Sequence, residues 1–145
     1  MRGIRKVTRA TATTAAVIMG VSFATIGTAQ AQAPKVFTWN YTMRAGDCTM
    51  FPGAKWTLYP DGTAEFDGTV TSGDNNDAWL MWAHLKDANG AVLTSLTNKH
   101  FLPSDRTKFV KNLPDRTKRY RWFAEGKFNS GWFNLIKGMS LSKHC

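Results

Sequence analysis

The stretch WTLYPDGTAEFDGTV, residues 56–70, carries the strongest indication of the fold. Pro60-Asp61-Gly62 has the composition of a turn, in which glycine can adopt the positive φ that restarts a strand. After this turn, apolar and polar side chains alternate with a period of two, as in a strand with one buried face. The apolar positions are Ala64, Phe66, Gly68 and Val70, and the polar ones are Thr63, Glu65, Asp67 and Thr69. The stretch therefore predicts an antiparallel hairpin.

A similar succession of strands and turns continues on both sides of this hairpin. Residues 79–86 predict a long apolar strand, which turns at Asp87-Ala88-Asn89-Gly90 and returns over residues 91–96. Further strands are expected at residues 36–42, 107–112 and 120–128. Short strands separated by turns are typical of a β-sandwich or a closed β-barrel.

The C-terminal tail is the exception, because its apolar residues follow a helical spacing. Asn129 or Ser130 would cap a short helix, and Gly138 would end it. The apolar face of this helix would consist of Trp132, Leu135, Ile136 and Met139. The predicted fold is therefore all-β, a small antiparallel barrel or sandwich of about seven or eight strands with a short C-terminal helix.

Residues 1–31 have the pattern of a secretory signal peptide. A basic leader is followed by an uncharged, partly apolar run from Ala10 to Ala24 and by the small-x-small sequence Ala29-Gln30-Ala31. Cleavage is predicted after Ala31, with Ala33 as the alternative. A membrane anchor would need about 20 strongly apolar residues, and this run is shorter and rich in Ala and Thr. We therefore expect a secreted, extracellular protein with no integral membrane segment after cleavage.

Residues 32–145 are expected to form a single disulfide-linked β domain. Removal of the basic leader lowers the formal net charge from +9 for the whole chain to +5 for this domain. Both cysteines of the chain, Cys48 and Cys145, lie in the domain. In an oxidising compartment two such cysteines are expected to pair, whereas two free thiols would be typical of a reducing one. The bond would join the last residue to the beginning of the domain.

Five stretches carry a resemblance to known proteins. They are AGDCTM (45–50), WTLYPDGTAEFDGTV (56–70), NDAWLMWAHLKDANG (76–90), KFVKNLP (108–114) and YRWFAEGKF (120–128), followed by the terminal cysteine. With them the chain resembles an uncharacterised family of short secreted actinobacterial proteins, classed as a domain of unknown function. The resemblance covers about residues 36–145. It implies export and a single domain, and it brings no activity, ligand or catalytic residue.

Trp82 and His84 are candidate ligand-binding residues. Strand alternation places them on one face, opposite a face with the more core-like Trp79 and Met81. If the face of Trp82 and His84 lined a barrel interior, the two side chains would mark a pocket for a small apolar ligand. The alternative is a partly exposed histidine beside Lys86. The chain has no H-E-x-x-H motif and no Cys/His cluster, so neither a metal site nor a cofactor is predicted.

A basic segment is the second candidate site. The segment contains Arg106, Lys108, Lys111, Arg116, Lys118, Arg119 and Arg121, and Tyr120 and Trp122 are interleaved at its end. Basic side chains beside aromatic ones are typical of polyanion-binding surfaces. We therefore predict anion binding, to an extracellular polyanion, at Arg116, Lys118, Arg119 and Arg121. The alternative is a solvated basic face on strands whose inward residues are Phe109 and Trp122.

No catalytic residues are predicted, because no nucleophile motif or converging pair of acids is recognisable. The pattern favours a non-catalytic binding module, with either a small ligand in a β pocket or an anionic polymer on the basic face. The alternative function is an extracellular interaction module, such as an inhibitor of a secreted enzyme. The loop that such an inhibitor presents would be Asp74–Asp77 or residues 98–106.

Overall fold

The computed structural model describes residue 27 and residues 30–100 and 104–145. Residues from Ala31 to Cys145 form one compact unit. The predicted signal peptide lies almost wholly outside the described residues, and so does part of the predicted loop at residues 98–106. Within the described residues, no helix has the length and apolarity needed to cross a membrane.

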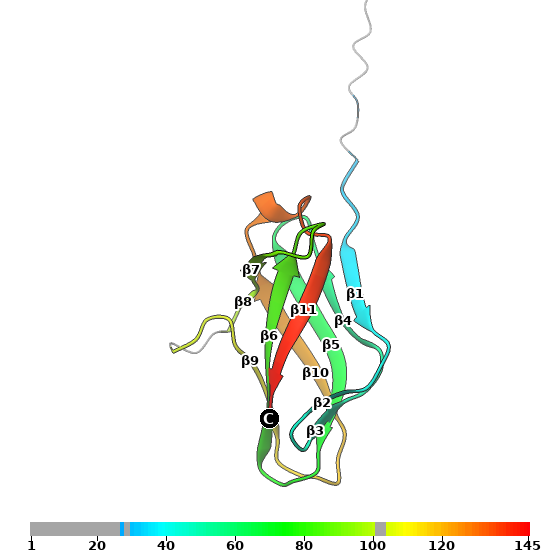
Figure 1. Cartoon of the computed structure of the whole chain (residues 1–145), viewed down its shortest axis with the longest axis vertical. Coiled ribbons are helices and arrows are strands. Elements are labelled where there is room, and N and C mark those ends of the chain that lie inside the picture. The colour runs from blue at the N-terminus through cyan, green and yellow to red at the C-terminus, as the bar shows by residue number, and fades with distance from the viewer. Residues whose placement is uncertain (1–26, 28–29, 101–103) are drawn as a thin grey trace, which may run out of the picture. The chain divides into compact units, whose positions relative to one another are not determined.

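The larger of two antiparallel sheets, here called sheet A, has seven strands (Figure 1). They are β1 (Lys35–Trp39), β2 (Met43–Ala45), β3 (Cys48–Met50), β4 (Ala54–Leu58), β5 (Thr63–Ser72), β8 (Thr97–Asn98) and β10 (Tyr120–Lys127). The central strand is β5. It pairs with β4 and β3 along one edge and with β10 along the other, and β1 and β8 lie outside β4 and β10.

Sheet B has four strands, and β6 is at its centre. The strands are β6 (Asp77–Lys86), β7 (Val92–Ser95), β9 (Phe109–Leu113) and β11 (Gly138–His144). Strand β11 pairs with one edge of β6 over seven residues. The other edge of β6 is shared, because β7 pairs with its C-terminal part and β9 with its N-terminal part.

The core lies between the inward faces of the two sheets. Trp56 and Phe66 of sheet A and Trp79 and Phe109 of sheet B are all at most 1% exposed. The rings of Trp56 and Phe109 meet edge to face at 5.1 Å and so join the two sheets. The sheets do not close into a barrel, since β9 and β10 are not paired. Of the two predicted architectures, the molecule therefore has the open sandwich.

The all-β prediction and the first hairpin are confirmed. Strands β4 and β5 pair antiparallel, with Trp56 opposite Phe66. Gly62 has a φ of +88° in the intervening turn, and Gly90 has a φ of +80° in the turn after β6. Along β5 the apolar positions are buried and the polar ones face outward, as the alternation predicts.

The prediction of a C-terminal helix is wrong. A single 3-10 turn at Ser130–Trp132 is capped by the Asn129 side chain, and the chain then enters β11. Leu135, expected on the buried helical face, is 56% exposed. A short isolated helix has little intrinsic stability. The Lys137 N–H instead donates to the Lys86 carbonyl at 2.8 Å, and the chain continues as β11 along the open edge of β6.

The described residues contain eleven strands, more than the seven or eight expected. Strand β11 is one of the additions, and the other three are β2, β3 and β8, which are two or three residues long. Strands of this length show no recognisable alternation, so only their pairing partners identify them.

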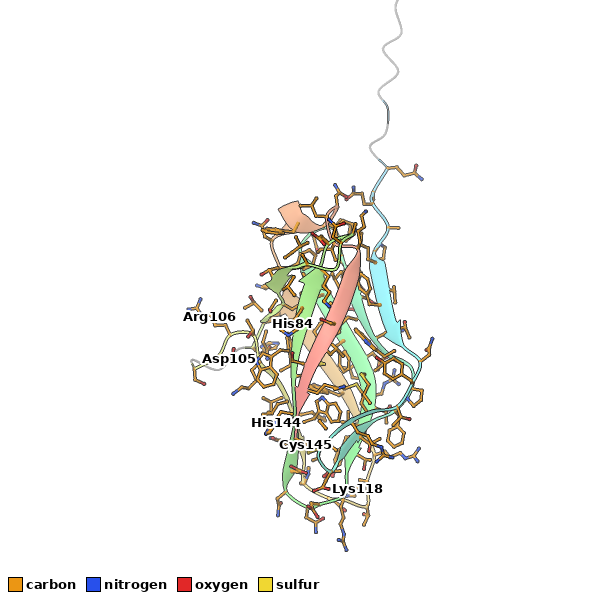
Figure 2. The ribbon with its side chains drawn as sticks, in the orientation of Figure 1. His84, Asp105, Arg106, Lys118, His144 and Cys145 are labelled. Atoms are coloured by element: carbon orange, nitrogen blue, oxygen red, sulfur yellow. A yellow bond between two sulfur atoms is a disulfide. The ribbon has the colours of Figure 1, made fainter. Side chains whose placement is uncertain are left out.

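The predicted disulfide is confirmed. Cys48 in β3 is bonded to Cys145, which directly follows β11, across a separation of 97 residues. Because β3 belongs to sheet A and β11 to sheet B, the bond links the two layers of the sandwich covalently. Figure 2 shows Cys145 at this end of β11.

Candidate ligand-binding site

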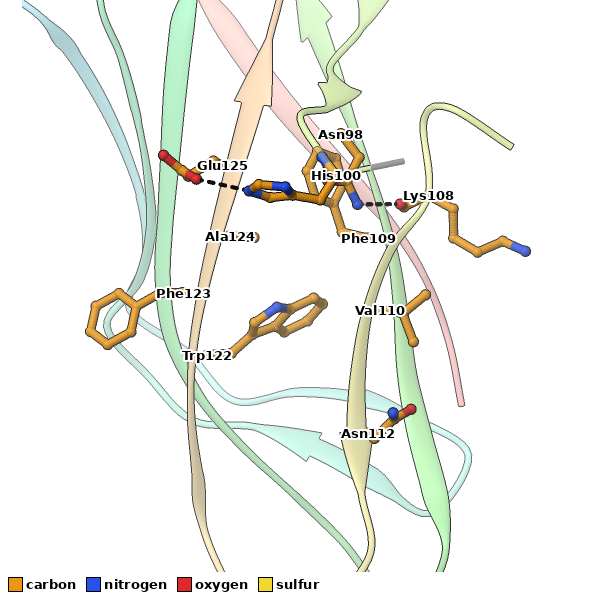
Figure 3. Close-up of a pocket in the computed structure, with 10 residues that line it drawn as sticks. All are labelled: Asn98, His100, Lys108, Phe109, Val110, Asn112, Trp122, Phe123, Ala124 and Glu125. Carbon is orange, nitrogen blue, oxygen red and sulfur yellow. Dashed lines mark hydrogen bonds and ion pairs between the residues drawn. The ribbon is translucent and has the colours of Figure 1, made fainter. Parts of the chain in front are cut away.

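A hollow of about 670 Å³ lies between β9 and β10, where the two sheets fail to pair (Figure 3). The outer edge of β10 pairs with β8 only at Gly126 and Lys127, so the rest of that edge faces β9 without a strand between them. We call this space the seam hollow. It is lined by Asn98, His100, Lys108, Phe109, Val110, Asn112, Trp122, Phe123, Ala124 and Glu125.

The end of the seam hollow next to β8 is closed by polar contacts. The side-chain amide of Asn98 donates to the carbonyl of Lys108 at 2.9 Å. The carboxylate of Glu125 is held by Lys99 Nζ at 2.9 Å and lies 3.1 Å from His100 Nε2. The hydrogen bond from Lys99, followed by that from His100, lowers the pKa of Glu125 below its ordinary value. Glu125 is therefore an ionised acceptor at neutral pH.

The apolar floor of the seam hollow belongs to the core. Trp122 and Phe109 line the hollow although they are only 3% and 1% exposed. The ring of Trp122 packs edge to face against Phe66 at 5.2 Å. A floor built from core side chains is held in place by the packing of both sheets.

A second hollow of about 430 Å³ lies on the outer face of β4, β5 and β10. It is lined by Lys55, Thr57, Tyr59, Glu65, Phe66, Asp67, Phe123, Ala124 and Glu125. We call it the sheet hollow. It shares Phe123, Ala124 and Glu125 with the seam hollow, so the two hollows adjoin along β10, and Figure 3 shows Phe123 on the side of this strand away from Trp122. The two hollows together are named the Phe123 face below.

Phe123 stands at the junction of the two hollows and is 65% exposed. The guanidinium of Arg121 lies 4.7 Å from the centre of its ring, within the range of a cation–π contact. Arg121 is in turn held by Asp67, whose two carboxylate oxygens accept hydrogen bonds of 3.1 and 2.8 Å. This pair lowers the pKa of Asp67. The exposed ring is thus supported by an ordered ion pair.

Two carboxylates face outward from neighbouring strands of sheet A. Glu65 of β5 is directly opposite Glu125 of β10. Like charges in such positions repel, and each has its own stabilising partner. The Tyr59 hydroxyl donates to Glu65 at 2.9 Å, which raises the pKa of Tyr59, and Lys99 and His100 hold Glu125. The lowered pKa keeps the Glu125 carboxylate ionised at neutral pH, and Glu65 accepts the hydrogen bond from Tyr59, so both side chains act as hydrogen-bond acceptors.

Trp82 and His84 lie on the outer face of sheet B and line neither hollow. Trp82 donates its indole N–H to Asp105 at 3.0 Å. The two ring nitrogens of His84 each lie 2.8 Å from a serine hydroxyl, those of Ser95 and Ser142. In Figure 2, Lys118 is at the lower end of the view, and His84 and Asp105 lie well away from it. Ligand binding by Trp82 and His84 stays a prediction.

The predicted anion-binding residues fall into two groups. Arg121 lies on sheet A and is engaged with Asp67. Arg116, Lys118 and Arg119 are exposed in the loop between β9 and β10. Lys118 lies 3.5 Å from Asp115, and the guanidinium of Arg119 lies 4.2 Å from the ring centre of Phe51. Anion binding by these residues stays a prediction.

Among the described residues, one group of side chains of the types that bind metal ions lies close together: Cys48, Asp77 and Cys145. The two sulfur atoms are joined in the disulfide and provide no thiolate. Asp77 also accepts a hydrogen bond from the Ser72 hydroxyl at 2.7 Å. We therefore interpret Asp77 as a polar neighbour of the disulfide and not as a metal ligand.

The sequence interpretation missed Phe123 and Tyr59. One local signal was present, because strand alternation in residues 120–128 places Phe123 on the polar side of its strand between Arg121 and Glu125. The seam hollow had no local signal, since it results from the missing pairing of two strands that belong to different sheets.

Comparison with known proteins gives one match. Residues 55–145 match the model of a family described as a family of unknown function, DUF6294. No curated protein and no solved structure matches the chain. All residues that line the two hollows fall within the matched segment.

Proposed function

The chain belongs to the DUF6294 family of unknown function, and we propose that its domain is a non-catalytic extracellular binding module with its ligand site on the Phe123 face. One observation carries the proposal. Phe123 is 65% exposed at the junction of two hollows, and its ring contacts the guanidinium of Arg121, which is itself hydrogen-bonded to Asp67. A large aromatic side chain that is exposed and already ordered loses little entropy on binding, and such residues dominate binding energies.

The surroundings of Phe123 support binding in preference to catalysis. The floor of the seam hollow is rigid, and the carboxylate of Glu125 is ionised and paired. A hollow of a few hundred Å³ with an apolar floor and a few placed polar groups is typical of ligand sites. Export, expected from residues 1–31, would place this site outside the cell.

The test is ligand-induced thermal stabilisation of residues 32–145. The probes are a mixed panel of oligosaccharides, short peptides, aromatic fragments and short-chain polyphosphate. A ligand that binds the folded state alone raises the Tm. We expect at least one probe to do so for the natural domain, and Phe123→Ala to abolish the shift. Val92→Ala, at a 57% exposed apolar residue on sheet B, is the matched control and should keep it.

Two results would contradict the proposal. One is a panel in which no probe raises the Tm. The other is a shift that survives in Phe123→Ala at full size, because the ligand would then bind elsewhere. A rise in Tm with polyphosphate alone, independent of Phe123 and lost at high salt, would instead support a site at Arg116, Lys118 and Arg119 in the loop between β9 and β10, here called the basic loop.

The basic loop is the second candidate site, and its exposure favours it. Arg116, Lys118 and Arg119 all face solvent within four consecutive positions. The separation of 3.5 Å between Lys118 and Asp115 is that of a surface pair, which competes weakly with a polyanion. Binding there would neutralise several charges and would weaken steeply with salt.

An inhibitor function is the other alternative, and it rests on the predicted loop Asp74–Asp77. Asp77 belongs to β6, so the connection between β5 and β6 spans residues 73–76. This loop is anchored at both ends. The Asp74 N–H donates to the Ser72 hydroxyl oxygen at 3.1 Å, and the Asn76 N–H donates to the Pro114 carbonyl at 3.1 Å. Inhibitory loops need this kind of preorganisation.

A further inference from the structure

We infer that the Phe123 face binds a neutral oligosaccharide of several units, an inference that rests on the proposed function of this face. Its first support is the charge. Among the described residues in and beside the two hollows, the carboxylates of Glu65, Asp67 and Glu125 are accompanied by the cations of Lys55, Lys99, Lys108 and Arg121. The charges nearly cancel, so neither a polyanion nor a polycation gains much net attraction.

The hydrogen-bonding groups are the second support. A sugar hydroxyl is both a donor and an acceptor, so a site for it needs groups of both kinds. Glu65 and Glu125 are outward-facing acceptors on neighbouring strands, and Lys55 is an exposed donor across the sheet hollow. The unpaired edges of β9 and β10 add main-chain donors and acceptors in the seam hollow.

Aromatic rings supply the third support. Phe123 and Tyr59 both line the sheet hollow, and the positions of both are restrained, by Arg121 and by Glu65 respectively. The face of an aromatic ring carries negative charge density, which attracts the polarised C–H groups of a sugar ring. Apolar contact and polar contact thus alternate across the same surface, as they do on a sugar.

The size and the ends of the site are the fourth support. The seam and sheet hollows, of about 670 and 430 Å³, adjoin at Phe123, so a chain of sugar units can run from one to the other. An added peptide strand fits poorly. The contact from Asn98 to Lys108 closes one end of the seam, and the loop between β9 and β10 closes the other. Strands β9 and β10 also run antiparallel to one another, so an inserted strand would pair parallel with one of them.

The experiment is a calorimetric titration of residues 32–145 with defined hexasaccharides. The neutral probes are β-1,4-linked glucose, xylose and N-acetylglucosamine hexamers and the α-1,4-linked glucose hexamer. The anionic probe is hexagalacturonate, and each is measured at 50 and 500 mM NaCl. We expect one neutral hexamer to bind with a Kd that changes less than about twofold between the two salt concentrations. Phe123→Ala should weaken it at least about tenfold, and Val92→Ala should not.

The outcomes separate this inference from the proposed function. If peptides or aromatic fragments bind in a Phe123-dependent manner and no neutral hexamer does, the face is a binding site and the saccharide assignment is wrong. Tightest binding of hexagalacturonate, with a Kd that rises steeply with salt, also overturns it. If no probe of any class binds in a Phe123-dependent manner, the proposed function fails together with the inference.

Discussion

At the scale of single residues, the molecule fixes its exposed aromatic and polar side chains through charged partners. Arg121, which is hydrogen-bonded to Asp67, contacts the ring of Phe123. Glu65 accepts a hydrogen bond from the Tyr59 hydroxyl, and Asp105 accepts one from the indole N–H of Trp82. The hydrogen bonds from Arg121 and from Trp82 lower the pKa of Asp67 and of Asp105, so both carboxylates are ionised at neutral pH. Hydrogen bonds to ionised groups are shorter and stronger than neutral ones. The order of the outer faces should therefore depend on pH.

Asp105 gives the clearest pH prediction. The hydrogen bond from Trp82, together with those from Thr107, lowers the pKa of Asp105 to about 2, against about 3.9 in an unfolded chain. Because the folded pKa is the lower one, the carboxylate stabilises the fold fully above pH 4 to 5 and ceases to do so as the pH falls towards 2. The Tm difference between the natural domain and Asp105→Asn should therefore be present at pH 6 and shrink towards pH 2.

Asp74→Asn, which removes an exposed carboxylate from the loop of residues 73–76, is the control for the loss of charge alone. If the Tm difference caused by Asp105→Asn is the same at pH 6 and pH 2, the contact between Asp105 and Trp82 does not stabilise the fold through its charge.

At the scale of elements, the turns and strand edges decide how the sandwich closes. The turn between β4 and β5 lies against the end of β10, where the Phe128 N–H donates to the Gly62 carbonyl at 2.9 Å. A Cβ on Gly62 would lie 2.5 Å from the Phe128 carbonyl oxygen. Gly90, in the turn between β6 and β7, has a similar φ, and a Cβ there would meet nothing within 4 Å.

These two glycines form a matched pair for a stability measurement. Gly90→Ala should cost about 1–2 kcal/mol, the strain of a positive φ on a residue with a side chain. Gly62→Ala carries the same strain and also a contact that the backbone must relieve, so it should cost about 3 kcal/mol or more. Urea unfolding measures both. Equal losses would show that the turn does not pack against β10 as described.

How much the sequence reveals also depends on the element. Strands β5 and β6 were predictable because ten-residue strands with one buried face alternate clearly. A helix was wrongly predicted before β11 because Trp132, Leu135, Ile136 and Met139 have helical spacing. Strand β11 itself was missed, since its partner β6 lies more than fifty residues earlier. The seam hollow could not be predicted, since it depends on which strand edges stay unpaired. Phe123 was recognisable as an outward aromatic residue, but the contact with Asp67 that fixes its neighbour Arg121 is a long-range one.

At the scale of the whole molecule, the disulfide is the covalent link between the sheets. Closing a loop of 97 residues stabilises a fold by up to about 4–5 kcal/mol in the chain-entropy model. Cys48→Ala should therefore lower the Tm and expose one reactive thiol, that of Cys145. Chemical reduction of the natural domain should lower the Tm to a similar degree, without the loss of a buried side chain. An unchanged Tm and no new thiol would contradict the role of this bond.

The arrangement of the sandwich accounts for the position of the proposed site. Sheet A and sheet B are joined at the disulfide and through the core, and they remain unpaired between β9 and β10. The seam hollow follows from this incomplete closure, and the exposed Phe123 lies beside it because strand alternation places it on the outer face of β10. The family match over residues 55–145 contains this part of the molecule in full.

The central claim, that the ligand occupies the Phe123 face, is tested most directly by mapping amide chemical shifts in a ¹⁵N-labelled domain. The hexasaccharide or other probe that raises the Tm most is titrated into the natural protein. We predict that the largest shifts fall on Phe123, Glu125 and Val110, while those of Trp82 and His84 on the outer face of sheet B change little. Largest shifts at Trp82 and His84, or in residues 116–119, would contradict the account and move the binding site to the face where they occur.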